Sequence, residues 1–208
     1  MRLILVRHGE TDHNRDSITL GRADAPLNAR GRAQARAVAA SFIRPPAAIY
    51  ASPLARAADT ARAISIATGV AVVTEPDLIE MDVGEMEHLR RAELRERYPE
   101  FLQRWLSDPA DARMPGGETL REVQDRAWAA VERIRQEHAD AEVVAVAHSF
   151  VIATVVCRVL NLPLAEFRRL GHGLASRTVI DIRDGGATLI HLNDHAHLQA
   201  AGLSGGTT

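Results

Sequence analysis

Residues 3–14 read Leu3-Ile4-Leu5-Val6-Arg7-His8-Gly9-Glu10-Thr11-Asp12-His13-Asn14, which places a short apolar run directly before a group of polar side chains. Four apolar residues are too few for a buried helix, and the polar segment that follows favours a fully buried parallel strand. His8 then lies just past the carboxyl end of this strand, the edge where ligands bind to open α/β sheets. Gly9 is expected to let the backbone turn sharply and approach a ligand closely.

Expected strands and helices alternate along the rest of the chain. Ser52 is expected to cap a helix that has Pro53 at its first position and ends at Gly69. The alternation predicts an α/β fold, a three-layer α/β/α sandwich with a mostly parallel central sheet. The expected strands are 47–51, 70–74, 143–147, 178–182 and 188–192, and the other expected helices are 28–42, 119–134 and 149–160.

Length and composition predict a single domain over residues 1–208, since 208 residues with 46% hydrophobic content can bury one core. The segment at about 75–117 is broken by prolines and has aromatic anchors. We expect it to be a helical, cap-like insertion that covers the sheet edge. The residues after Ala201 are expected to be mobile.

The charge balance limits the class of partner. A net charge of −2 gives no global field for nucleic acid or an anionic membrane, and no stretch resembles a signal peptide or a membrane span. All 25 basic residues are Arg, so any cationic clamp must use guanidinium groups. Cys157 is the only cysteine, which predicts a buried structural thiol and a cytoplasmic location.

Arg7-His8-Gly9-Glu10-Thr11 resembles the signature of the histidine phosphatase superfamily, which includes the phosphoglycerate mutases. Further segments match the family in the same order along most of the chain, namely residues 21–27, 52–60, 77–84 and 115–118, and His148. The resemblance implies a phosphoglycerate mutase-like fold and the phosphatase branch of the family. It implies a metal-independent phosphomonoesterase that needs no cofactor and acts on a small-molecule phosphate ester.

His8 and His148 each follow an expected buried strand and can therefore meet at one edge of the sheet. A neutral imidazole is a competent nucleophile toward phosphorus, and a phosphohistidine intermediate divides one difficult displacement into two easier ones. Guanidinium groups suit the phosphoryl oxygens because each can bind two at once. By the resemblance, His8 is the nucleophile, and the phosphoryl oxygens are held by Arg7, Arg56, His148 and Asn14.

A leaving alkoxide needs a proton, and a carboxyl group that supplies it should have a raised pKa. Glu80 matches the family's acid, and Asp82 is its rival because it lies only two positions away. Glu118 matches a residue that supports the site. The remaining positions expected to bind substrate are Gly21, Arg22 and Ser149. Arg22 either meets a second anionic group of the substrate or is a solvated charge in a loop.

The chain departs from the family pattern at Met86 and His88, where an aromatic residue and a glycine are common. His88 either reaches the substrate or lies on the surface, and the identity of the phosphate ester stays open. A second histidine group, His191, His195 and His197, does not have the spacing of a zinc site. We expect it to lie at a strand end and in an exposed tail, with no metal bound.

Two alternatives to a phosphatase stay open. A phosphoglycerate mutase of the same family would return the phosphoryl group to a sugar-acid hydroxyl, although this chain is compact for such an enzyme. From another class, a catalytically inert module would bind phosphate without reacting, although all the proposed catalytic residues are present. The oligomeric state cannot be read from the sequence, which is compatible with a homodimer.

Overall fold

The computed structural model describes residues 1–203 and contains a six-stranded sheet of order β3-β2-β4-β1-β5-β6. Strands β1 to β4 are parallel to one another, and β5 and β6 run antiparallel at one edge. The prediction of a mostly parallel sheet is therefore confirmed. The strands are β1 (Arg2–Arg7), β2 (Ala48–Ala51), β3 (Val72–Thr74), β4 (Glu142–Ala147), β5 (Arg177–Arg183) and β6 (Gly186–Asp194).

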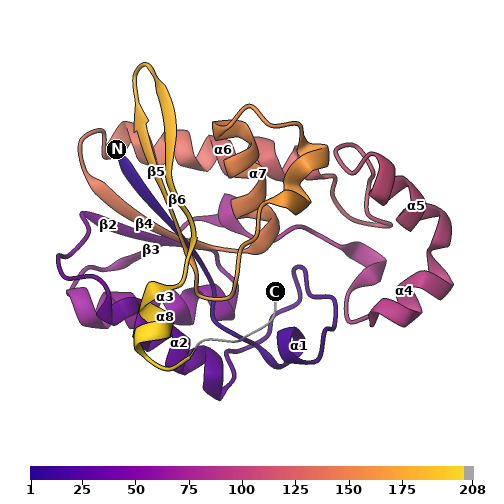
Figure 1. The fold of residues 1–208 in the computed structure, drawn as a ribbon, viewed down its shortest axis with the longest axis horizontal. Helices are drawn as coiled ribbons and strands as arrows, with labels where there is room; N and C mark the ends of the chain where they lie inside the picture. The colour runs from indigo at the N-terminus through magenta and orange to yellow at the C-terminus, as the bar shows by residue number, and fades with distance from the viewer. Residues whose placement is uncertain (204–208) are drawn as a thin grey trace.

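Helices cover both faces of this sheet, with α6 and α7 on one side and α2, α3 and α8 on the other (Figure 1). The α-helices are α1 (Asp12–Arg15), α2 (Ala29–Ala40), α3 (Ala55–Thr68), α4 (Arg91–Arg97), α5 (Pro99–Ser107), α6 (Leu120–Glu137), α7 (Ser149–Val159) and α8 (Ala196–Ala200). Three short 3₁₀ helices complete the elements, η1 (Pro76–Leu78), η2 (Gly84–Met86) and η3 (Leu164–Arg169).

Strand β1 shows why the fold has three layers. Leu3 and Leu5 belong to the core formed with α6 and α7, whereas Ile4 and Val6 belong to the core formed with α2 and α3. Successive side chains of a strand point to opposite faces, so an uninterrupted apolar run indicates a strand buried on both sides. The predicted α/β/α sandwich is confirmed.

The helix starts follow the sequence in two cases and differ in one. Asn28 caps α2 by accepting the N–H of Gly31, and Thr119 caps α6 through a capping box with Glu122. The predicted cap at Ser52 is wrong, because α3 begins at Ala55 and its N-cap residue makes no side-chain hydrogen bond. The Ser52 N–H instead donates to the carbonyl of Val146 at 3.0 Å, which continues the strand ladder past β2.

Residues 75–117 form η1, η2, α4 and α5, and α4 and α5 lie at the right of Figure 1, away from the sheet. Trp105 of α5 packs against Phe150 of α7 and Phe167 of η3, with ring centroids 6.1 Å and 5.7 Å apart. These rings attach α5 to the rest of the molecule. We propose that residues 1–208 form one domain in which this segment is a cap.

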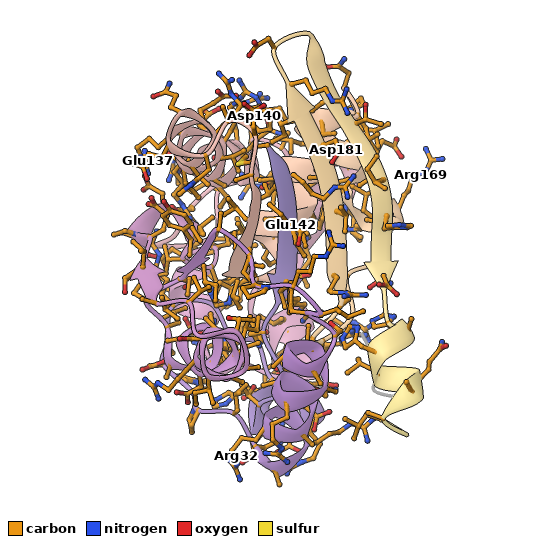
Figure 2. All side chains as sticks on the ribbon, turned by 90° about the vertical axis from the view of Figure 1, so that its left-hand side faces the viewer. Arg32, Glu137, Asp140, Glu142, Arg169 and Asp181 are labelled. Carbon is orange, nitrogen blue, oxygen red and sulfur yellow. The ribbon has the colours of Figure 1, made fainter. Side chains whose placement is uncertain are left out.

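The amino ends of the central strands and the start of α2 lie at opposite ends of the molecule. Asp140, just before β4, and Arg32, near the start of α2, lie at opposite ends of the molecule (Figure 2). The amino ends of β1 and β4 thus lie far from the start of α2. The predicted mobility after Ala201 concerns mainly residues 204–208, which lie outside the described residues.

Candidate active site

Adjacent parallel strands bring the two predicted histidines together. Arg7 of β1 pairs with Ala147 of β4, and the N–H of His8 donates to the Ala147 carbonyl at 3.1 Å. His8 and His148 therefore follow neighbouring strand ends, and their ring centroids lie 5.1 Å apart. Residues far apart in the sequence thus share one edge of the sheet, as the strand pattern predicted.

The His8 ring is held in one tautomer. Its Nδ1 lies 2.7 Å from the carbonyl oxygen of Gly9, which can only accept a hydrogen bond. Nδ1 must therefore carry the proton, which leaves a lone pair on Nε2. Burial, together with the charges of Arg56 and Arg7, holds the pKa of His8 well below its ordinary value. The ring is neutral near pH 7, the state that a nucleophile requires.

His148 is completely buried and contacts Ser52, which was predicted to be a helix cap. Its Nε2 lies 2.7 Å from the Ser52 hydroxyl, and its Nδ1 has no hydrogen-bond partner within residues 1–203. Burial and the charge of Arg56 lower the pKa of His148 well below the usual value. The free Nδ1 is available to a group that enters the site.

The guanidinium groups of Arg7, which is half-buried, and Arg56, which is buried, give the site its positive charge. Arg7 donates to the carbonyl of His172, and Arg56 donates to the carbonyls of Gly21 at 2.6 Å and Ala23 at 3.0 Å. The Nε atoms of both arginines have no hydrogen-bond partner among the described residues. Burial lowers the pKa of Arg7 to about 10 and also lowers the pKa of Arg56. Both remain cationic at neutral pH and are suited to an anion.

Glu80 has the environment of an acid, because its side chain is buried and accepts the Met81 N–H at 2.8 Å. Burial raises the pKa of Glu80, while this N–H and the charges of Arg56 and Arg7 oppose the rise. The rival Asp82 accepts the N–H of Gly84 and lies 3.5 Å from the Arg22 guanidinium, about a third exposed. The geometry favours Glu80 over Asp82 as the proton donor.

The other residues predicted to bind substrate are Asn14, Gly21, Arg22 and Ser149, and three of them bond to groups of the protein. The Asn14 Oδ1 accepts the N–H and hydroxyl of Thr11, so donation to an anion would fall to its amide N–H₂. Gly21 supports Arg56 through its carbonyl. Arg22 donates to Glu118 at 2.8 Å, so its charge is partly neutralised within the protein. Ser149 is the first residue of α7.

One expectation needs correction, and one residue has a further role. At Gly9 a Cβ would lie 2.5 Å from the Gly31 carbonyl oxygen, so the small size of Gly9 admits the start of α2. His197 is not part of an exposed tail, since it is buried and its Nε2 lies 2.8 Å from the Ala175 carbonyl. His88, by contrast, is exposed and lies 3.1 Å from the ring of His13.

Sequence reasoning missed three residues at the site, Ser52, Arg126 and His172. Ser52 was interpreted as a cap, although its place in a segment that matches the family was a usable signal. Arg126 belongs to α6 and binds the backbone around Glu80. His172 lies in the loop before β5, where no periodic pattern marks it, and burial with the nearby charge of Arg7 lowers its pKa to about 4.

Neither a metal cluster nor a membrane span is found in the part of the chain that the structure describes. No group of three or more His, Cys, Asp or Glu side chains in residues 1–203 could hold a metal ion. Within the same residues, no helix combines the length and apolar character that a membrane crossing needs. Cys157 is buried, and burial raises the pKa of its thiol to about 11, as suits a packing residue.

The site combines two neutral imidazoles, two guanidinium groups and a carboxyl group with a raised pKa at one sheet edge. These groups fit a histidine-dependent phosphoryl-transfer enzyme. Residues 3–195 match the model of the Histidine phosphatase superfamily (branch 1), and the chain belongs to this family.

Relatives and a solved structure agree with this membership. Phosphoserine phosphatase 1 of Hydrogenobacter thermophilus is 34% identical over 199 residues, which cover 95% of this chain and 94% of that protein. A protein of Enterobacter sp. named Probable phosphoglycerate mutase GpmB is 31% identical over 209 residues, 98% and 97% of the two chains. Bacillus stearothermophilus YhfR superposes with a TM-score of 0.90 at 28% identity, covering 95% of this chain and 98% of that one. The predicted family, fold and phosphoric monoester hydrolase class are confirmed.

Proposed function

We propose that this protein hydrolyses a small phosphate monoester through a phosphohistidine formed at His8, without a metal or other cofactor. The observation that supports this most directly is the hydrogen bond from His8 Nδ1 to the Gly9 carbonyl, which leaves Nε2 unprotonated. The Nε–H groups of Arg7 and Arg56, which have no partner within residues 1–203, could donate to an anion.

In the first step, Nε2 of His8 forms a bond to phosphorus as the ester P–O bond breaks. Glu80 gives its proton to the departing oxygen, and its raised pKa keeps that proton available. The negative charge on the phosphoryl oxygens is held by Arg7, Arg56, His148 and the Asn14 amide. His148 also precedes α7, and the positive end of that helix adds to the field.

In the second step, water attacks phosphorus, the Glu80 carboxylate accepts a proton from that water, and the bond to His8 breaks. The products are inorganic phosphate and free enzyme. The same residue thus acts first as acid and then as base, as the reversal of proton transfer between the two steps requires.

The proposal extends to the substrate and setting. Phosphoserine is the first ester to test because the relative from Hydrogenobacter thermophilus is named for it. The proposal includes no nucleic-acid or membrane partner, allows a homodimer, and places the protein in the cytoplasm, which its single buried thiol supports.

The decisive test measures inorganic phosphate release from a panel of phosphomonoesters in the presence of chelator, for wild type and His8→Ala. We expect release to survive chelator, to disappear in the variant, and to pass through an acid-labile phosphoprotein. Full turnover by His8→Ala would falsify the proposal. Interconversion of 2- and 3-phosphoglycerate without phosphate release would favour the mutase, and anion binding without a phosphoprotein would favour the inert module.

A further inference from the structure

Arg126 of α6 binds the segment that carries Glu80 through three backbone carbonyls. Its Nη1 donates to the carbonyls of Asp77 at 2.7 Å and Ile79 at 2.6 Å, and its Nη2 donates to the carbonyl of Glu80 at 3.1 Å. The contacts lie on the acid itself and on two of the three residues before it. One side chain thus fixes the backbone from which the Glu80 carboxyl group projects.

The remaining donors of Arg126 go to Glu118. Nε donates to Glu118 Oε1 at 3.0 Å and Nη2 to Oε2 at 3.1 Å, a bidentate pair. A guanidinium has five N–H donors, and here all five have an acceptor. Both side chains are more than four-fifths buried, so the charge-assisted hydrogen bonds are weakly screened by solvent.

Glu118 extends the same clamp to the residues after Glu80. Its Oε2 accepts the N–H of Asp82 at 2.9 Å, and its own N–H donates to the Asp82 carbonyl at 2.9 Å. The neighbouring Gly117 allows this approach, since a Cβ there would lie 2.2 Å from the Asp82 carbonyl oxygen. The backbone is therefore held both before and after Glu80.

We propose that Arg126 is a positioning residue for Glu80, holding residues 77–80 so that the Glu80 carboxyl group meets the departing oxygen. The inference rests on the proposed acid role of Glu80. A misplacement of about 1 Å at a reacting group can cost on the order of 100-fold in rate, so the backbone clamp matters for chemistry as well as for stability. Lysine cannot replace it, because an ammonium is a point charge with three donors.

The test compares two esters that differ in how much the leaving oxygen needs a proton. p-Nitrophenyl phosphate releases a resonance-stabilised phenolate, whereas the best alkyl phosphate of the panel releases an alkoxide that must be protonated. The quantity to measure is kcat/KM, because it reports the steps up to P–O cleavage and not the later hydrolysis of phosphohistidine.

We expect Arg126→Met to lower kcat/KM for the alkyl ester about 100-fold and for the aryl ester about threefold or less, since general acid catalysis contributes about 10²–10⁴-fold. Arg126→Lys keeps the charge but not the fork, so a selective loss of about tenfold is expected. If Arg126→Met does not fold, Arg126→Lys decides the matter alone. An equal loss on both esters, or no loss, in the folded Arg126→Lys protein overturns the inference.

Two further variants separate the causes. Arg121→Met is the matched control, because Arg121 lies on the same helix and forms an exposed bidentate pair with Asp111. It should leave both esters unchanged. Glu80→Gln should reproduce the alkyl-selective loss of Arg126→Met. If Glu80→Gln affects both esters equally, the proposed acid role itself fails; if it is selective and the Arg126 variants are not, only the positioning role fails.

Discussion

At the scale of single residues, the contact between Ser52 and His148 should control activity as well as stability. Ser52→Ala leaves Nε2 of a completely buried imidazole without its 2.7 Å partner. An unsatisfied buried group costs about 1–3 kcal/mol, and loss of ring orientation should lower kcat/KM about tenfold. Because the proposed role of His148 is to hold the phosphoryl oxygens, the loss should be equal for aryl and alkyl esters.

The measurement is kcat/KM for both esters together with the free energy of unfolding in urea. Ser107→Ala is the control, since Ser107 is exposed in α5 and bonds only to its own helix. A Ser52→Ala protein that is less stable but fully active would show that the contact serves folding alone.

Ser52 also shows which site residues could not be predicted from the sequence. Arg7, His8, Arg56 and His148 could be selected because each stands in a short motif or directly after an apolar strand. The role of Ser52 depends on a partner that follows a different strand, and that pairing exists only once β2 and β4 are adjacent. Arg126 is similar, since its acceptors are carbonyls that every residue type carries.

At the scale of elements, the helix boundaries follow local rules except where tertiary contacts compete. Asn28 and Thr119 cap the helices that their side chains predict. Ser52 has the chemistry of a cap but continues the ladder beside β4, so α3 begins at Ala55, two residues after the predicted start at Pro53. The Ser52 hydroxyl therefore accepts the N–H of Leu54, the N-cap residue, at 3.3 Å and also contacts His148.

The attachment of α5 should depend on Trp105. Its ring packs on Phe101, Phe150 and Phe167, so Trp105→Ala should destabilise the protein by about 2 kcal/mol, less than a fully buried aromatic, because the ring is only half-buried. Amide hydrogen exchange in α4 and α5 should accelerate more than in α6. Trp128→Ala is the control, because this half-buried ring belongs to α6 and makes its cation–π contact with Arg158 of α7. Similar exchange in α5 for both variants would contradict the prediction.

At the scale of the whole molecule, alternation of strands and helices predicts the layers but not the strand order. β1 is sandwiched between β4 and β5, although both follow it by more than half of the chain. That order depends on which faces pack together, and no local pattern records it. The site inherits its geometry from this order, because parallel neighbours β1 and β4 end side by side, far from Asp140 at the other end (Figure 2).

Buried neutral histidines should make the stability of the whole molecule fall in acid. The pKa of His172 is lowered to about 4 by burial and by the charge of Arg7, against about 6.5 in an unfolded chain. Between these values the unfolded chain binds the proton and the folded chain does not, so stability rises with pH. The contribution is complete above about pH 6.5 and is lost as pH falls toward 4.

For this residue the loss at pH 5 should be about 2 kcal/mol. Urea unfolding at pH 8 and pH 5 should therefore show that wild type loses about 2 kcal/mol more than His172→Gln, whose side chain does not titrate. His191→Gln is the control and should lose as much as wild type, because this side chain is exposed on β6 and contacts solvent in the folded as well as the unfolded chain. An acid loss in His172→Gln as large as that of wild type would show that the His172 ring is not what couples folding to pH.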